Sequence, residues 1–146
     1  MGASQECLYG GLMQNYDCGN SEATTDSVTV SVSAKYLSNR SDPLRRRFLF
    51  SYIVAIANNG PQPVQLLTRR WLIRNGFGRL QVVEGVGVVG ETPSIPPGGV
   101  HTYESFCPLD TDFGSMSGSY GMSTDDGRQF DAEIGTFSLY APTAIQ

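Results

Sequence analysis

Hydrophobic and polar residues alternate one by one along several short segments of this chain. In the first, Val28, Val30 and Val32 share one face, and threonine and serine lie between them on the other face. Segment 48–56 repeats the pattern with aromatic and β-branched residues. A period of two residues is typical of a half-buried β-strand. Nowhere do apolar residues recur at helical spacing over three turns, so the pattern predicts an all-β protein.

The alternating segments are short and are separated by residues that favour turns. The clearest turns are Asn58-Asn59-Gly60-Pro61, Asn75-Gly76-Phe77-Gly78 and Asp125-Asp126-Gly127. We expect strands at 28–37, 48–56, 64–74, 79–84, 100–106, 115–123, 129–134 and 137–140. Seven or eight short strands at this spacing indicate a β-sandwich or a β-barrel, and the pattern alone leaves that choice open.

The chain has 146 residues, which suits one domain with a workable core. Residues 1–26 sustain no period of two or 3.6 and are interpreted as a flexible arm or linker end. The domain itself is expected at 27–142, with a short tail at 143–146.

Composition narrows the classes of partner. The formal net charge is −4, which disfavours a nucleic-acid-binding surface. Three cysteines without a CxxC spacing argue against a thiolate metal site. They favour reduced thiols inside the cell, in the cytoplasm or nucleus, or in a mitochondrion if the chain is a fragment. No apolar run approaches the ~18 residues that span a bilayer, so no membrane partner is expected. The sequence leaves the oligomeric state open.

Several motifs occur in a fixed order along these expected strands. They are Val28-x-Val30-x-Val32, Phe50-x-Tyr52-x-Val54-x-Ile56, Arg69-x-Trp71-x-Ile73, Gly85-x-Gly87-Val88-Val89-Gly90-Glu91-x-Pro93, and Cys107-Pro108-Leu109-x-Thr111-x-x-Gly114-x-Met116-x-Gly118-x-Tyr120. The ordered set resembles the ApaG domain family over roughly 28–139. That resemblance implies an immunoglobulin-like or fibronectin-type-III-like β-sandwich. One departure is Ile134-Gly135, where the family often has Ile-Pro.

The resemblance also implies a function. Family members are free-standing bacterial proteins and C-terminal domains of eukaryotic F-box proteins and of a polymerase-delta-interacting protein. In F-box proteins the domain is thought to help select substrates for ubiquitin ligation. We therefore expect a protein-protein interaction module that recognises a protein partner or substrate, and that would serve a ubiquitin ligase if the parent is an F-box protein. The expected partner surface comprises Asp110, Thr111, Asp112, Gly114, Met116 and Tyr120.

The glycine run supports an alternative function. Gly85, Gly87 and Gly90 read as G-x-G-x-x-G, but Pro93 and the prolines after it prevent the helix that a dinucleotide site needs. Backbone N–H groups in such a loop, with Glu91 at its end, can still form an anion nest for a phosphate or nucleotide, aided by nearby arginines. The plain alternative is that glycine lets the chain bend and pass close to another strand. No cofactor is required by either interpretation.

No catalytic or metal constellation stands out. His101 is the only histidine; Ser105 shares its expected strand face, but Glu104 lies on the opposite one, which opposes a triad. Asp110 and Asp112 faintly resemble a calcium loop, yet its twelfth position holds Gly121 in place of glutamate. At most a weakly bound divalent ion is expected there. The sequence therefore predicts a binding protein and not an enzyme.

Overall fold

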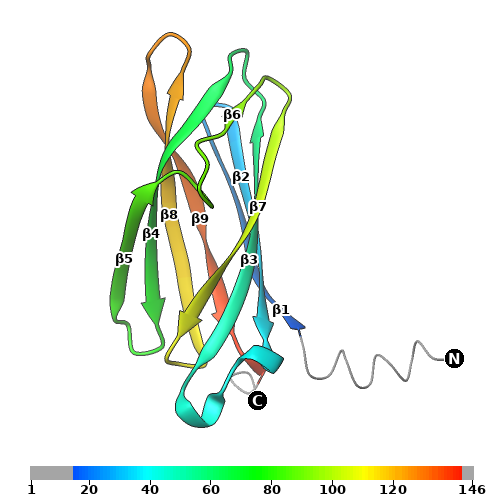
Figure 1. Ribbon diagram of the computed structural model, residues 1–146, viewed down its shortest axis with the longest axis vertical. Helices are drawn as coiled ribbons and strands as arrows, with labels where there is room; N and C mark the ends of the chain where they lie inside the picture. Colours follow the sequence, from blue (N-terminus) through cyan, green and yellow to red (C-terminus); the bar gives the residue numbers. More distant parts are fainter. Residues whose placement is uncertain (1–14, 143–146) are drawn as a thin grey trace, which may run out of the picture.

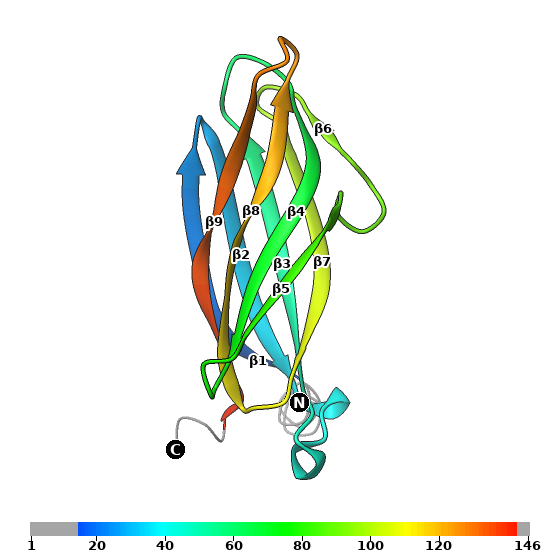
Figure 2. The same cartoon turned by 90° about the vertical axis from the view of Figure 1, so that its left-hand side faces the viewer.

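Two antiparallel β-sheets pack face to face in the computed structural model, which describes residues 15–142 (Figures 1 and 2). The first sheet has the order β1-β2-β3-β7: β1 (Asn15–Thr25), β2 (Val28–Leu37), β3 (Phe48–Asn58) and β7 (Val100–Leu109). The second has the order β5-β4-β8-β9: β5 (Leu80–Val86), β4 (Val64–Asn75), β8 (Phe113–Thr124) and β9 (Gln129–Tyr140). The short β6 (Ser94–Ile95) pairs with β4, and 3₁₀ turns η2 (Ser38–Arg40) and η3 (Pro43–Arg45) precede β3. The prediction of an all-β sandwich is confirmed.

The alternating residues supply the core between the sheets. Val28, Val30 and Val32 on β2 are buried, and the residues between them face outward. Trp71 on β4 lies at the centre, with its ring centroid 5.2 Å from that of Tyr52 on β3 and 6.0 Å from that of Phe137 on β9. Edge-on aromatic contacts of this kind add about 0.5–1.5 kcal/mol each beyond the area they bury. Trp71 is thus a central member of the buried cluster that joins the two sheets.

Two element assignments from the sequence differ from the structure. The interpretation of residues 15–26 as part of a flexible arm is wrong, because β1 pairs with β2 over this stretch. A register shift between Asp17 and Asn20 breaks the alternation, and Cys18 is the only buried residue of β1, so no apolar period marks the strand. The two strands expected at 129–134 and 137–140 form one continuous strand, β9. Residues 1–14 and 143–146, the rest of the arm and the tail, lie outside the described residues.

One lateral side of the sandwich is closed by β1 and β9, which belong to different sheets (Figure 2). The Cys18 thiol donates to the carbonyl oxygen of Tyr140 at 3.2 Å. The Glu133 backbone N–H donates to Thr25 Oγ1 at 3.1 Å, and Arg128 Nη1 lies 2.9 Å from Asp26 Oδ2. The opposite side, between the edge strands β5 and β7, has no comparable closure among residues 15–142.

Within the same range, no helix is long and apolar enough to cross a membrane.

A substitution at Gly19 tests the closure between β1 and β9. A Cβ at Gly19 would lie 2.6 Å from the Ser138 backbone nitrogen, so Gly19→Ala must push the two strands apart. We expect it to lower the free energy of unfolding by about 1–3 kcal/mol, measured by urea denaturation. Gly60→Ala is the control, because its Cβ would meet only side-chain atoms, at 3.3 Å and beyond. Equal effects of the two changes would contradict this contact.

Candidate functional site

The expected partner surface divides between solvent and core. Asp110 is exposed and Asp112 half-buried, whereas Met116 and Tyr120 are 1% and 0% exposed. The prediction that Met116 and Tyr120 form a partner surface is therefore wrong. Both lie on the inner face of β8, where Tyr120 packs against Trp71 with ring centroids 6.3 Å apart. Along β8 these two residues alternate with serines, which face outward. That alternation was the sequence signal that could have placed Met116 and Tyr120 in the core and not on the partner surface.

Thr111 and Gly114 have structural positions in the β7–β8 loop and at the start of β8. Thr111 is 7% exposed; its hydroxyl donates to the Phe113 carbonyl at 2.7 Å and accepts from the Gly76 N–H at 2.8 Å. Gly114 lies so close to β4 that a Cβ would be 2.3 Å from the Arg74 carbonyl oxygen. These two residues therefore shape the loop and offer little surface to a partner.

The glycine run forms the end of β5 and a tight turn. Val88 and Glu91 exchange backbone hydrogen bonds of 2.8 and 3.0 Å, and the turn residues Val89 and Gly90 both have positive φ, 48° and 78°. Two consecutive positive φ values are typical of a type I′ turn. Gly87, with φ 67°, donates its N–H to the Leu67 carbonyl oxygen at 2.8 Å. A strand precedes the glycines and a turn follows them, so the expectation of no dinucleotide-binding helix agrees with this geometry.

Arg69 on β4 holds this glycine turn against the sheet. Its Nη1 donates to the carbonyl oxygens of Val86 at 3.0 Å and Gly87 at 2.9 Å. The guanidinium lies against Gly85, where a Cβ would be 2.7 Å from Nη2. The absence of a side chain at Gly85 therefore makes room for the arginine. The N–H groups of Gly87, Val88 and Glu91, which an anion nest would use, already donate within the protein.

Tyr52 and Tyr103 line a cleft beneath the turn on the open side of the sandwich, and the buried Tyr120 lies behind Tyr103. Tyr103 and Tyr120 share a short hydrogen bond between their hydroxyls. Burial raises the pKa of both hydroxyls well above their ordinary value, so both stay protonated at neutral pH. The cleft is lined by Tyr52, Arg69, Trp71, Val88, Val89, Gly90, Tyr103, Glu104, Ser105 and Phe106.

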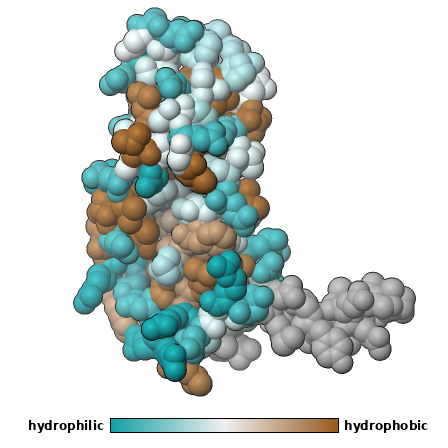
Figure 3. Space-filling model, viewed as in Figure 1, coloured by the Kyte–Doolittle hydropathy of each residue, from teal (hydrophilic) through white to brown (hydrophobic). Residues whose placement is uncertain are grey.

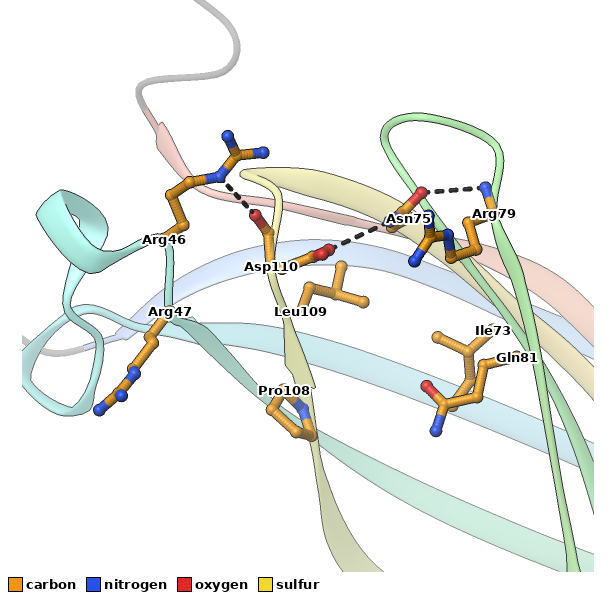
Figure 4. Close-up of a pocket in the computed structure, with 9 residues that line it drawn as sticks. All are labelled: Arg46, Arg47, Ile73, Asn75, Arg79, Gln81, Pro108, Leu109 and Asp110. Atoms are coloured by element: carbon orange, nitrogen blue, oxygen red, sulfur yellow. Dashed lines mark hydrogen bonds between the residues drawn. The ribbon is translucent and has the colours of Figure 1, made fainter.

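A second cleft, which we call the basic cleft, opens where β5 begins and β7 ends (Figure 4). It encloses about 360 Å³. Its lining combines arginines with an apolar floor: Arg46, Arg47, Ile73, Asn75, Arg79, Gln81, Pro108, Leu109 and Asp110. Among residues 15–142, the ion pairs are Arg45–Asp42, Arg70–Glu84 and Arg128–Asp26, so none involves an arginine of this cleft. The cleft therefore carries local positive charge on an acidic chain.

Hydrogen bonds fix three loops together beside the basic cleft. Asn75, at the end of β4, accepts from the N–H groups of Phe77 and Arg79 at 2.9 and 3.0 Å. Its Nδ2 donates to the Asp110 carboxylate at 3.1 Å, and Arg46 Nε donates to the Asp110 carbonyl at 3.4 Å (Figure 4). The β4–β5 hairpin, the β7–β8 loop and the turn before β3 are thus joined at the lower end of Figure 1.

Large apolar side chains are exposed on these joined loops. Phe77 is 75% exposed and Phe113 49% exposed, and the Arg46 guanidinium lies over the Phe77 ring, 5.4 Å from its centroid. We call the surface formed by Arg46, Asn75, Phe77, Asp110 and Phe113, which the buried Thr111 supports from below, the loop-end platform. Leu44, on the adjacent turn η3, is 98% exposed. Sequence reasoning missed Phe77 because the turn was noted only for its glycines and asparagine.

The residues considered for chemistry are placed apart from one another or buried. His101 faces inward on β7, with its ring 6.3 Å from that of Tyr103. Burial raises the pKa of the Cys107 thiol to about 12. Among the described residues, no group of three or more His, Cys, Asp or Glu side chains is arranged to hold a metal ion.

The comparisons with known proteins agree on one family. The ApaG domain matches residues 38–124. Protein ApaG of Pseudomonas aeruginosa PAO1 is 50% identical over 122 residues, which cover 84% of this chain and 97% of that protein. Protein ApaG of Ectopseudomonas mendocina is 48% identical over 118 residues, covering 81% and 94%. The crystal structure of an ApaA protein from Bordetella pertussis superposes on this fold with a TM-score of 0.77. The two sequences are 41% identical, and the match covers 79% of this chain and 94% of that protein.

A pair of glycine substitutions tests the geometry of the turn. Gly87 and Gly90 both have positive φ, but only at Gly87 would a Cβ collide, 2.2 Å from the Glu91 carbonyl oxygen. Both alanine variants pay the cost of a left-handed residue, about 1 kcal/mol, and we expect Gly87→Ala to lose about 1–3 kcal/mol more. Thermal or urea unfolding of the two variants measures the difference. If Gly90→Ala destabilised the protein as much as Gly87→Ala, the close approach of Gly87 to the Glu91 carbonyl oxygen would be disproved.

The buried thiol yields a prediction of reactivity. Because the thiolate is the nucleophile and the pKa of Cys107 is about 12, this thiol stays protonated at pH 8 in the folded protein. We expect iodoacetamide to modify it at least about tenfold more slowly than in denaturant. Peptide-level mass spectrometry separates its modification from that of Cys7 and Cys18. Rapid labelling of Cys107 under native conditions would show that the site opens to solvent.

Proposed function

The chain belongs to the ApaG domain family, and on that premise we propose that it is a protein-protein interaction module that binds its partner through the loop-end platform. The observation that carries the proposal is the preformed surface itself. Loops from three distant parts of the sequence are hydrogen-bonded together, and exposed aromatic rings and arginines project from them.

The composition of the platform supports protein recognition. Aromatic residues and arginine are enriched at the cores of protein interfaces, where they contribute most of the binding energy. Phe77 stacked under Arg46 offers both at one point. Because Asn75 and Asp110 already hold the loops in position, a partner would order few additional groups on binding.

Binding without catalysis is part of the same proposal. The Cys107 thiol and the Tyr103 and Tyr120 hydroxyls are held protonated by burial, a state unsuited to nucleophilic attack. Cys18 and Cys107 are free, buried thiols, which supports an intracellular location. Selection of substrates for ubiquitin ligation would apply only where such a domain is joined to an F-box.

The alternative of a phosphate or nucleotide site at Gly85, Gly87, Gly90 and Glu91 has less support. The cation nearest the turn, Arg69, already donates to two of its carbonyl oxygens. Arg70 pairs with Glu84 at 3.1 Å on the outer face of the sheet. We therefore favour the simpler role for these glycines, in which they let β5 pass close to Arg69 and turn sharply.

Photo-crosslinking tests the proposed surface. Phe130 is the comparison position for Phe77: each carries an arginine over its ring, at 5.1 and 5.4 Å, at opposite ends of the sandwich, although Phe130 is partly buried. We expect a photoreactive phenylalanine at position 77 to capture a defined protein in native extract. Adding Arg46→Glu should reduce capture about tenfold, because it reverses a charge at the contact.

The control places the photoreactive residue at position 130 and adds Arg128→Glu. This protein should capture the same partner weakly, and its charge reversal should change nothing. Equal capture from positions 77 and 130, or capture from 77 that survives Arg46→Glu, would contradict the proposed surface.

A further inference from the structure

The four sheet edges of this sandwich differ in how well they are protected. β1 and β9 cover each other along the closed side. On the open side, β7 carries Glu104 in its middle and Pro108 near its end. Charged residues and proline are the usual means by which proteins prevent an edge strand from pairing with another chain. β5 has no proline, and its one charged residue, Glu84, is paired with Arg70 of the neighbouring strand at 3.1 Å.

The hydrogen-bond register shows which groups of β5 face the open edge. The Asn75 N–H donates to the Arg79 carbonyl, and the Gly87 N–H donates to the Leu67 carbonyl. In an antiparallel pair, hydrogen-bonded residues alternate with residues whose N–H and C=O point away from the partner strand. Given the pairing of β4 with β5, the residues that point away are Leu80, Val82, Glu84 and Val86. Of these, the Val86 carbonyl already accepts from Arg69.

The same residues expose apolar side chains on the outer face of the second sheet. Leu80 is 43%, Val82 44% and Val86 75% exposed. Figure 3 shows hydrophobic surface at mid-height on the left, where Figure 1 places β5. An edge with free backbone groups and apolar alternate side chains matches what strand addition requires: main-chain hydrogen bonds give affinity and side-chain contacts give specificity.

The charge at one end of β5 indicates the chemistry of the added segment. β5 begins at the basic cleft, where Arg79 and Gln81 line one wall and Arg46 lies across from them. A strand added antiparallel to β5, the slightly more stable arrangement, would have its C-terminal end beside Leu80. Acidic side chains or a terminal carboxylate at that end would meet arginines that have no carboxylate partner within the described residues.

We propose that β5 accepts an extended segment of a partner protein as an added antiparallel strand, apolar at alternate positions and acidic at the C-terminal end that enters the basic cleft. This inference rests on the proposed function and names the chemistry of the partner. The loop-end platform, which borders the same cleft through Asn75 and Asp110, would contact the partner beyond the added strand.

The experiment uses the full chain and a random dodecapeptide library displayed on phage. Selected peptides are synthesised, their Kd is measured by fluorescence anisotropy, and amide hydrogen exchange is followed by NMR. We expect peptides with acidic C-terminal halves that slow exchange of the Leu80, Val82 and Glu84 N–H groups. Failure to select any peptide, or binding without this protection, would overturn the proposal.

Proline substitutions provide the matched control. Val82→Pro removes an N–H that faces the open edge and that the fold does not use, and Thr102→Pro does the same on β7. We expect Val82→Pro to weaken peptide binding at least about tenfold, because it deletes a main-chain hydrogen bond and blocks close approach. Thr102→Pro should change the Kd less than about twofold, since β7 is not the proposed edge. Circular dichroism verifies that both variants fold.

A charge reversal tests the orientation. Arg79→Glu should weaken acidic peptides about tenfold, whereas Lys35→Glu, on the outer face of the first sheet, should not. Equal effects of the two reversals would show that the basic cleft does not bind the acidic end of the peptide.

Light scattering tests whether a second copy of this chain binds to β5 instead. A dimer of the free protein that Val82→Pro dissociates would assign the edge to that second copy and overturn the proposal. If the peptide tests failed but a photoreactive residue at position 77 still captured a partner, the proposed function would stand without the added strand.

Discussion

The closure of this sandwich along one side only is the constraint on which its other features depend. β1 lies so close to β9 that Gly19 has no room for a Cβ beside the Ser138 backbone. The two sheets are joined there and at Trp71, whose ring contacts Tyr52 of one sheet and Phe137 of the other. The opposite edges, β5 and β7, stay apart, and the two clefts with arginines lie between them. The fold thereby separates a structural side from an open side suited to recognition.

Polar side chains are used mainly to fix loops. Arg69 holds the glycine turn by its carbonyl oxygens, Asn75 closes its own hairpin and reaches Asp110, and Thr111 joins two loops. Each of these residues satisfies backbone groups that a loop would otherwise expose to water or leave unpaired. These hydrogen bonds join the loops, and Phe77 and Phe113 remain exposed on them. Loops that are already held in place lose less entropy when a partner binds.

The sequence predicted the strands whose two faces differ in polarity. Val28–Leu37 and Phe48–Asn58 each bury one face, so alternation revealed them. It failed at Asn15–Thr25, where an edge strand buries a single residue and a bulge interrupts the period. The site was predicted less well, because Met116 and Tyr120 carry the same residue types that a binding surface would use, and only their burial separates the two roles. The convergence of Arg46, Asn75 and Asp110 depends on contacts across 35 and 64 positions, which no local pattern encodes.

The central claim is that a partner protein binds at the loop-end platform on the open side. Hydrogen-exchange mass spectrometry of the chain alone and in complex with its captured partner tests it most directly. The account predicts slower exchange in residues 75–84 and 108–113 on binding, with β1 and β9 unchanged. Protection confined to β1, β9 or the outer face of the first sheet would contradict the account and move the interface to the closed side.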